Sequence, residues 1–214
     1  MVGLTPAAIR AALRQSAPRN VPEWRRLRRA WSRQLSSRPA GEIIRLATEL
    51  VNDGSWGRLT AYELVAHHPG GLAALTLTSI RRLGRGLADW GSVDTFACYL
   101  AGPAWREGRL PTRQINAWLR SQDRWQRRAA VVCTVALNVR ARGGRGDVAR
   151  TLAVCRQVVE DRDDMVVKAL SWALRSLVEW DRAVVAGFLI EHESRLAGRV
   201  KREVSTKLRT GRKH

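Results

Sequence analysis

The residues whose types and spacing suggest chemistry are Trp90 and Asp94, which lie four positions apart in the stretch "LADWGSVDTFACYL". Side chains at positions i and i+4 are neighbours on one face of a helix. The carboxylate is notable because lysine and arginine outnumber aspartate and glutamate by 38 to 19 in this chain. An indole face and a carboxylate both attract positive charge, so this pair predicts a site for a cationic ligand or transition state.

Two roles are open for Asp94. In the structural role, which is the commoner one for an aspartate, it pairs with a neighbouring arginine or caps a helix after Ser92. In the chemical role, it acts on an N-alkylated purine, whose positive charge weakens the glycosidic bond. Cleavage of that bond passes through an oxocarbenium-like sugar, and a nearby carboxylate stabilises this charge and holds the attacking water.

The overall charge indicates the class of partner. The formal net charge is +19 and the sequence pI is about 11.6, so the surface carries a strong positive field that attracts a polyanion. GC-rich coding would explain why arginine is preferred over lysine, but it does not explain the net charge. We therefore expect nucleic acid to be the partner.

Several other classes are disfavoured. There is no apolar run of about 20 residues that would span a bilayer. The N-terminal stretch is interrupted by Arg10 and Arg14 and lacks the apolar block of a signal peptide. We expect no membrane association and a cytoplasmic, nucleoid-associated protein.

The cysteine and histidine residues point to packing rather than to metal binding. Cys98, Cys133 and Cys155 are far apart and each is surrounded by apolar residues, which predicts buried thiols in a reducing compartment. His67 and His68 are adjacent, without another Cys or His at ligand spacing, and their role stays open. No Gly-rich phosphate loop or nucleophile elbow is present, so no cofactor or metal is expected.

The elements that must position these residues are helices. Stretches such as "VVKALSWALRSLVEW" place apolar residues on one helical stripe, and no sustained strand alternation occurs. Polar residues that resemble N-caps precede several such runs. They are Thr5, Ser55, Thr112, Asp123, Asp147, Asp164 and Asp181. The predicted fold class is all-α.

The helical pattern repeats. Trp56, Trp90 and Trp125 are 34 and 35 residues apart, and each precedes a small or apolar residue by eight positions, just over two helical turns. Stacked helix pairs of this period form an α-solenoid with a continuous, here basic, concave groove. Equivalent helices then lie side by side, which brings Trp90 and Asp94 near Arg127, Arg128 and Trp172.

The length predicts one domain spanning residues 1–208, with residues 1–20 as a short N-terminal arm. Residues 209–214 are expected to form a disordered basic tail that adds sequence-independent affinity for DNA. No heptad pattern or exposed apolar stripe predicts an oligomer, so we expect a monomer.

Four motifs resemble the AlkD family of HEAT-like-repeat DNA glycosylases. "WGSVD" at 90–94 is similar to the family's Trp-Asp-Ser/Thr-Val-Asp, and "WQRRAAVV" at 125–132 is similar to its Trp-x-x-Arg-Ala-Ala. "VVKALSWALRSL" at 166–177 resembles Lys-Ala-x-x-Trp-x-Leu-Arg, and "VKREVSTKL" at 200–208 resembles Lys-Arg-Glu-Ala. The resemblance covers residues 21 to 208, with the motifs in the family's order.

The resemblance implies an enzyme that hydrolyses the N-glycosidic bond of cationic alkylpurines such as 3-methyladenine, 7-methylguanine or bulkier adducts. It implies that Asp94 is catalytic, that Trp90 and Trp172 are aromatic walls of the cleft, and that Arg128 contacts the DNA backbone. In that family the duplex is gripped through its backbone, without a deep pocket for a flipped base. Further expected phosphate contacts are Arg127, Lys168 and Arg175, and additional ones are Arg25, Arg26, Arg28, Arg29, Lys201 and Arg202.

Two departures from the family pattern favour an alternative. Gly91 stands where an acidic residue usually follows the first tryptophan, and only some 20 residues precede "VPEWRRLRR", where the family usually carries helices that cover the damaged nucleotide. The alternative is a non-catalytic HEAT-like-repeat protein that binds duplex, bent or branched DNA. A solenoid scaffold for an acidic protein is a third interpretation, but it leaves the placement of Trp90, Asp94 and Trp172 unexplained.

Overall fold

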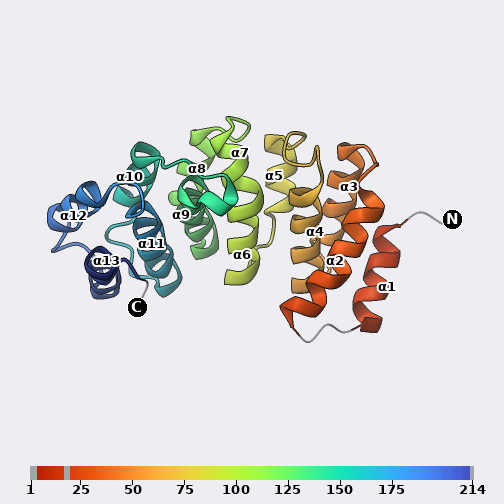
Figure 1. The fold of residues 1–214 in the computed structure, drawn as a ribbon, viewed down its shortest axis with the longest axis horizontal. Coiled ribbons are helices and arrows are strands. Elements are labelled where there is room, and N and C mark those ends of the chain that lie inside the picture. The colour runs from red at the N-terminus through yellow and green to blue at the C-terminus, as the bar shows by residue number, and fades with distance from the viewer. Residues whose placement is uncertain (1–3, 17–19, 213–214) are drawn as a thin grey trace. The chain divides into compact units, whose positions relative to one another are not determined.

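The computed structural model describes residues 4–16 and 20–212, and every regular element in these ranges is helical (Figure 1). The all-α prediction is therefore confirmed, and the order of short helices joined by tight turns is consistent with an α-solenoid of helical repeats. The chain divides into two compact units, residues 1–86 and 87–214. The single domain expected from the length stays a prediction.

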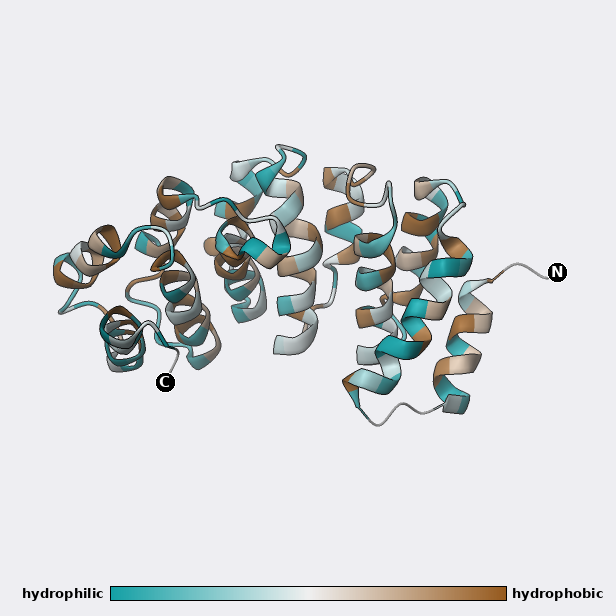
Figure 2. Cartoon of the chain, in the orientation of Figure 1, coloured by the Kyte–Doolittle hydropathy of each residue, from teal (hydrophilic) through white to brown (hydrophobic). Residues whose placement is uncertain are grey.

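The first unit contains helices α1 to α5. Their bounds are α1 Pro6–Ser16, α2 Val21–Leu35, α3 Ala40–Leu50, α4 Gly54–His67 and α5 Leu77–Leu83. Helices α3 and α4 form the most extensive contact, and α1, α2 and α5 pack against this pair. In Figure 2 the visible side of α2 is largely hydrophilic, whereas hydrophobic residues gather on the neighbouring α3 and α4. The unit thus buries apolar stripes between helices and leaves one side of α2 polar.

The second unit is built around the long helices α9 and α11. Its elements are α6 Trp90–Phe96, a π-helical turn Ala97–Ala101, α7 Gly102–Arg106, α8 Thr112–Leu119, α9 Arg124–Asn138, a 3₁₀ turn Arg140–Arg142, α10 Val148–Arg156, α11 Asp164–Leu177, α12 Arg182–Glu191 and α13 Gly198–Thr210. Helix α9 packs against α11, and α11 in turn packs against α13. The predicted apolar stripe of α11 is buried without exception. It consists of Val166, Leu170, Ala173, Leu174 and Leu177.

Helices α6 and α7 follow one another through the π-helical turn and run parallel to α9. The contacts have the same order along both, because Asp94 meets Arg128 and Gly102 meets Cys133 and Ala136. A Cβ added at Gly102 would lie 2.6 Å from the Cβ of Ala136 and 2.8 Å from the carbonyl oxygen of Cys133. Gly102 is therefore needed because the two backbones approach closely here.

The helix starts agree only partly with the sequence. Asp123, Asp147 and Asp181 accept hydrogen bonds from first-turn amides as N-caps, and Thr5 accepts one from Ala8. The other three expected caps, Ser55, Thr112 and Asp164, are wrong by one or two residues. The N-caps there are Asp53, Pro111 and Asp163, of which only Asp163 makes a side-chain bond.

The three thiols are buried and free, as expected for Cys98, Cys133 and Cys155. His67 and His68 each approach a backbone carbonyl oxygen, of Glu63 at 2.8 Å and of Arg38 at 3.0 Å. These contacts give both imidazoles a structural role in the first unit.

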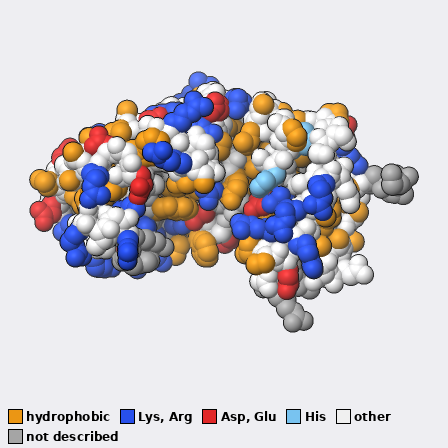
Figure 3. Space-filling view, in the orientation of Figure 1, with side chains coloured by type: hydrophobic (Ala, Val, Ile, Leu, Met, Phe, Trp, Pro, Cys, Tyr) orange, Lys and Arg blue, Asp and Glu red, His pale blue; other side chains and the backbone are white. Residues whose placement is uncertain are grey.

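Basic side chains gather over several parts of the visible surface, including regions near α2 in the first unit and near α13 in the second (Figure 3). Helix α13 continues to Thr210, so Arg209 and Thr210 are helical and the expectation of disorder is wrong for them. Lys213 and His214 of the expected tail, and residues 1–3 and 17–19 of the expected arm, lie outside the described residues. Within the described ranges, no helix combines the length and the apolar character required to cross a membrane.

Candidate functional site

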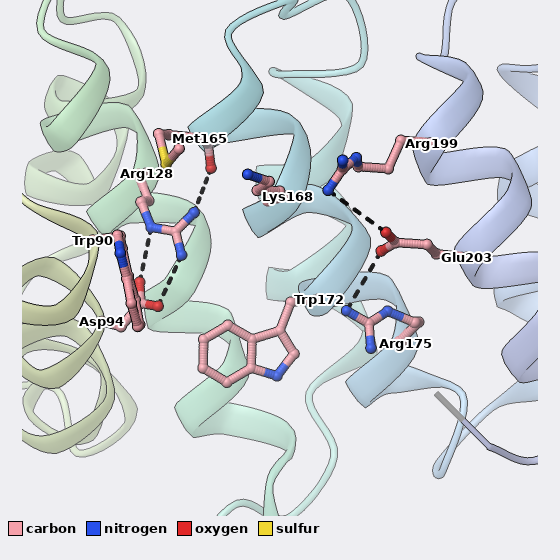
Figure 4. Close-up of a pocket in the computed structure, with 9 residues that line it drawn as sticks. All are labelled: Trp90, Asp94, Arg128, Met165, Lys168, Trp172, Arg175, Arg199 and Glu203. Atoms are coloured by element: carbon pink, nitrogen blue, oxygen red, sulfur yellow. Dashed lines mark hydrogen bonds and ion pairs between the residues drawn. The ribbon is translucent and has the colours of Figure 1, made fainter. Parts of the chain in front are cut away.

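A cleft of about 620 Å³ opens on the second unit, between α6, α9, α11 and α13. Figure 4 shows its side chains converging from these four elements. The lining residues are Trp90, Asp94, Arg128, Met165, Lys168, Trp172, Arg175, Arg199 and Glu203. Helix α9 contributes Arg128 from its N-terminal half, whereas α11 lines the cleft along most of its length, from Met165 to Arg175.

Asp94 and Arg128 form a two-pronged ion pair on one wall. Nε and Nη2 of Arg128 donate hydrogen bonds of 2.9 and 2.8 Å to the two carboxylate oxygens of Asp94. The remaining terminal nitrogen of Arg128 donates to the backbone oxygen of Met165 at 2.5 Å. Every nitrogen of this guanidinium is therefore engaged, and its orientation is fixed.

Local sequence explains why the pair forms. Asp89 caps α6 by accepting a 2.8 Å hydrogen bond from the amide of Ser92, so the helix begins at Trp90 and Asp94 falls one turn later. Asp123 starts α9, which puts Arg128 in its second turn. The cap of α6 is thus Asp89, and Asp94 is left available for the cleft.

The electrostatic setting of Asp94 combines two opposing effects. Burial raises the pKa of the Asp94 carboxyl above its ordinary value, because a low-dielectric setting disfavours the charged form. The hydrogen bonds and charge of Arg128 oppose this rise in pKa, with a further contribution from Arg142. Arg128 therefore favours the carboxylate form of Asp94 in a site that would otherwise favour the acid.

Two indoles flank this pair. Trp90 is 63% exposed, which is unusual for so large an apolar side chain and leaves its ring accessible from the cleft. Trp172 is half-buried and extends from α11 into the space between the Asp94–Arg128 pair and the α13 wall (Figure 4). Each ring can attract a cation through its π face.

The sequence model of a family described as "DNA alkylation repair enzyme" matches residues 18–208. The chain belongs to this family. The resemblance to its AlkD-type members, drawn from the four motifs, is confirmed. No curated protein and no solved structure matched in the corresponding comparisons. Membership of this family supports a role in DNA alkylation repair and, with it, DNA as the partner of the chain.

Arg128 is engaged by Asp94 and by the backbone of Met165, and its expected contact with the DNA backbone stays a prediction. The other expected phosphate contacts fall into two groups. Lys168 and Arg175 line the cleft, and the amine of Lys168 pairs with Asp164 at 2.6 Å. Arg127 lies elsewhere: it pairs with Asp161 at 2.7 Å and donates to two backbone carbonyls before α9. Its placement gives no support to a contact with DNA in the cleft.

The additional arginines of α2 differ in exposure. Arg26 and Arg29 are exposed, as is Arg25, which lies 3.7 Å from Glu63. Arg28 is only 7% exposed and pairs with Glu63 at 2.9 Å, so it has a structural role in the first unit. On α13, Arg202 is exposed and Lys201 is half-buried. Neither residue lines the cleft.

Sequence reasoning identified the motif at 200–208 but gave no role to Arg199 or Glu203, the two residues of α13 that line the cleft. Glu203 lies there with Arg199 and Arg175, and it accepts a 2.6 Å hydrogen bond from the hydroxyl of Ser171. A signal existed, because Glu203 is the one acidic residue in the basic stretch "GRVKREVSTKLRT". An isolated charge of the opposite sign on a basic helix indicates a specific partner.

Proposed function

We propose that the protein is a monofunctional DNA glycosylase that hydrolyses the N-glycosidic bond of cationic alkylpurines. The observation that carries this proposal is the position of Asp94, whose carboxylate lies in an open cleft between the indoles of Trp90 and Trp172. Both kinds of group favour positive charge, first on the alkylated base and then on the sugar as the bond breaks. The family assignment to DNA alkylation repair agrees with this chemistry.

In the proposed reaction, the bond between the base nitrogen and C1′ of the sugar breaks and its electron pair neutralises the departing cationic base. Asp94 stabilises the oxocarbenium-like sugar and orients a water molecule, whose oxygen bonds to C1′. One proton of that water passes to the carboxylate or to solvent. Arg128 keeps Asp94 ionised and oriented during this step.

A lysine nucleophile is not part of the proposal. Among the described residues, Lys168 is the one lysine that lines the cleft, and its amine is engaged by Asp164 at 2.6 Å. Attack on C1′ would need a free neutral amine. A water route leaves an abasic site and does not cut the strand.

The test uses a duplex that contains 7-methylguanine, with mass spectrometry of the released base and a gel run with and without alkali. We expect free 7-methylguanine, with strand breaks that appear only after alkali. Strand breaks without alkali would refute the monofunctional route. Absence of released 7-methylguanine, 3-methyladenine and bulkier adducts from alkylated genomic DNA would refute the glycosylase proposal.

The second candidate is a repair protein that binds DNA without excising a base. The observation in its favour is that Arg128 occupies both oxygens of Asp94, so a water must share this carboxylate with the guanidinium. This candidate requires salt-sensitive binding to duplex, bent or branched DNA with no base release. Alkali-labile sites that form only with protein and alkylated duplex would exclude it.

A further inference from the structure

The second carboxylate of the cleft, Glu203, has no part in the chemistry just described and stands among the basic residues Lys168, Arg175 and Arg199. A negative charge there repels DNA unless it organises cations. Two of the three contacts of Glu203 are with arginines, and the third is with a hydroxyl that also contacts one of these arginines. Its carboxylate lies 3.7 Å from Arg175 and 3.9 Å from Arg199, and it accepts the hydrogen bond from Ser171.

Ser171 connects these groups. Its hydroxyl is fully buried, donates to Glu203 at 2.6 Å, and accepts a 3.2 Å hydrogen bond from Nε of Arg175. Arg175 has only a 12% exposed side chain, and burial lowers its pKa while Glu203 opposes this. The Ser171 hydroxyl and the Glu203 carboxylate therefore offset the cost of keeping this guanidinium at the cleft wall.

Arg175 and Arg199 differ from Arg128 in the use of their donors. All three nitrogens of Arg128 are hydrogen-bonded within the protein. For Arg175 and Arg199, the distances to Glu203 exceed hydrogen-bond length, and the described residues provide no hydrogen bond to their terminal nitrogens. Terminal N–H groups that face a cleft in a fixed geometry are suited to phosphate oxygens.

We propose that Glu203 is a positioning residue that holds Arg175 and Arg199 as the phosphate clamp of the cleft. The clamp lies on the wall formed by α11 and α13, opposite the Asp94–Arg128 pair (Figure 4). It takes one backbone phosphate of duplex DNA between the two guanidinium groups, while Arg128 stays with Asp94. The inference rests on the proposed function only for the assignment of the bound strand as the damaged one.

The proposal reverses the simple electrostatic expectation. Removing a negative charge from a DNA-binding surface should strengthen binding. Removing the charge of Glu203 should weaken it, because the two arginines are no longer oriented by its carboxylate. The matched control is Glu160, whose 68% exposed carboxylate pairs with Arg195 outside the cleft.

The experiment compares Glu203→Gln with Glu160→Gln for binding to an unmodified duplex at several salt concentrations. We expect Glu160→Gln to bind as well as the parent or slightly better. Glu203→Gln should bind about tenfold more weakly, because the loss of one charge-assisted hydrogen bond from an arginine to a phosphate lowers affinity by about this factor. The slope of log affinity against log salt should shrink by about 0.9 for each phosphate that the variant no longer binds. Equal or tighter binding by Glu203→Gln, with an unchanged slope, would overturn the proposal.

Two further variants keep the outcome decisive. Ser171→Ala leaves every charge in place and should reproduce part of the decrease in slope. The double variant Arg175→Gln with Arg199→Gln should lower the slope at least as much as Glu203→Gln does, and adding Glu203→Gln to it should change nothing more. If circular dichroism shows that Glu203→Gln loses helical structure, the double variant of Arg175 and Arg199 becomes the deciding test. An unchanged slope of log affinity against log salt in that variant would overturn the proposed clamp. Failure to release a base leaves this test intact, because the duplex is unmodified.

Discussion

Arg127 and Arg128 are adjacent on α9 but pair with carboxylates on different elements. Arg128 turns to Asp94 in the cleft, whereas Arg127 pairs with Asp161 in the turn before α11. Both ion pairs span 34 residues and both carboxylate side chains are mostly buried, at 17% and 13% exposure. The chain thus contains a cleft pair and a matched pair outside the cleft.

Because the Asp161–Arg127 pair resembles the Asp94–Arg128 pair but lies outside the cleft, it provides the control for Asp94→Asn as a test of catalysis. The variant keeps the shape of the side chain but removes the charge that stabilises the sugar cation, so excision of 7-methylguanine should fall by about 100-fold or more. Duplex binding should stay nearly intact. Asp161→Asn breaks the matched ion pair and should leave excision unchanged. Single-turnover rates measure both variants, and equal rates for Asp94→Asn and the parent would reject the catalytic role.

The pH dependence of excision should report the pKa of Asp94. The carboxylate acts when ionised, so the rate is full above its pKa and falls as pH drops through it. Because burial raises this pKa from its ordinary value of 3.8, the fall should begin at a higher pH than for an exposed aspartate. The hydrogen bonds and charge of Arg128 are the main effects that lower the pKa of Asp94. Arg128→Gln should therefore raise this pKa and shift the acid limb of the profile to higher pH.

The control for the pH profile is Arg127→Gln, which leaves the contacts of Asp94 unaltered. Its acid limb should coincide with that of the parent protein. Excision rates of the parent, Arg128→Gln and Arg127→Gln, measured at a series of acidic pH values, check the prediction. If Arg128→Gln does not shift the acid limb of the pH–rate profile, a group other than Asp94 controls the loss of activity at low pH.

The two indoles should contribute to recognition of positive charge. Replacing Trp90 or Trp172 with leucine keeps an apolar side chain but removes the π face, which should cost about 0.5 to 2 kcal/mol of preference for a cationic over a neutral base. Competition between duplexes with and without 7-methylguanine measures this preference. For Trp90, which is 63% exposed, thermal stability should hardly change. If the parent and the variants prefer the duplex with 7-methylguanine to the same degree, the two rings have no part in recognising positive charge.

The close approach of α7 and α9 should make Gly102 sensitive to any added side chain. Gly102→Ala places a methyl group 2.6 Å from the Cβ of Ala136, and the required shift should destabilise the fold by about 1 to 3 kcal/mol. Gly187→Ala in the exposed side of α12 meets nothing within 4 Å and should stabilise by up to about 1 kcal/mol. Urea denaturation followed by circular dichroism compares the two, and similar midpoints would contradict the close packing.

The predictable part of the protein is the part that periodicity and spacing control. The apolar stripe of α11 and the caps at Asp123, Asp147 and Asp181 follow from local rules, so they could be identified without a structure. The shared cleft of Asp94 and Trp172 followed from the repeat, because equivalent helices stack.

The unpredicted part depends on which side chains meet across helices. The Trp-x-x-Arg-Ala-Ala motif distinguishes Arg128 from Arg127, but nothing local shows that the two side chains pair with different carboxylates. Neither the cap at Asp89 nor the contacts of Glu203 were foreseen. The first requires knowing that α6 starts at Trp90, and the second requires knowing that α13 packs on α11.

The buried thiols have a consequence for a protein of alkylation repair. Electrophiles that methylate purines also react with thiolates, and the thiolate is the reactive form of cysteine. Burial raises the pKa of Cys98 and Cys155 to about 12 and that of Cys133 well above its ordinary value. Burial therefore limits the reaction of these three cysteines with the electrophiles that alkylate DNA, and the protein keeps its thiols unmodified under the conditions in which alkylation repair is needed.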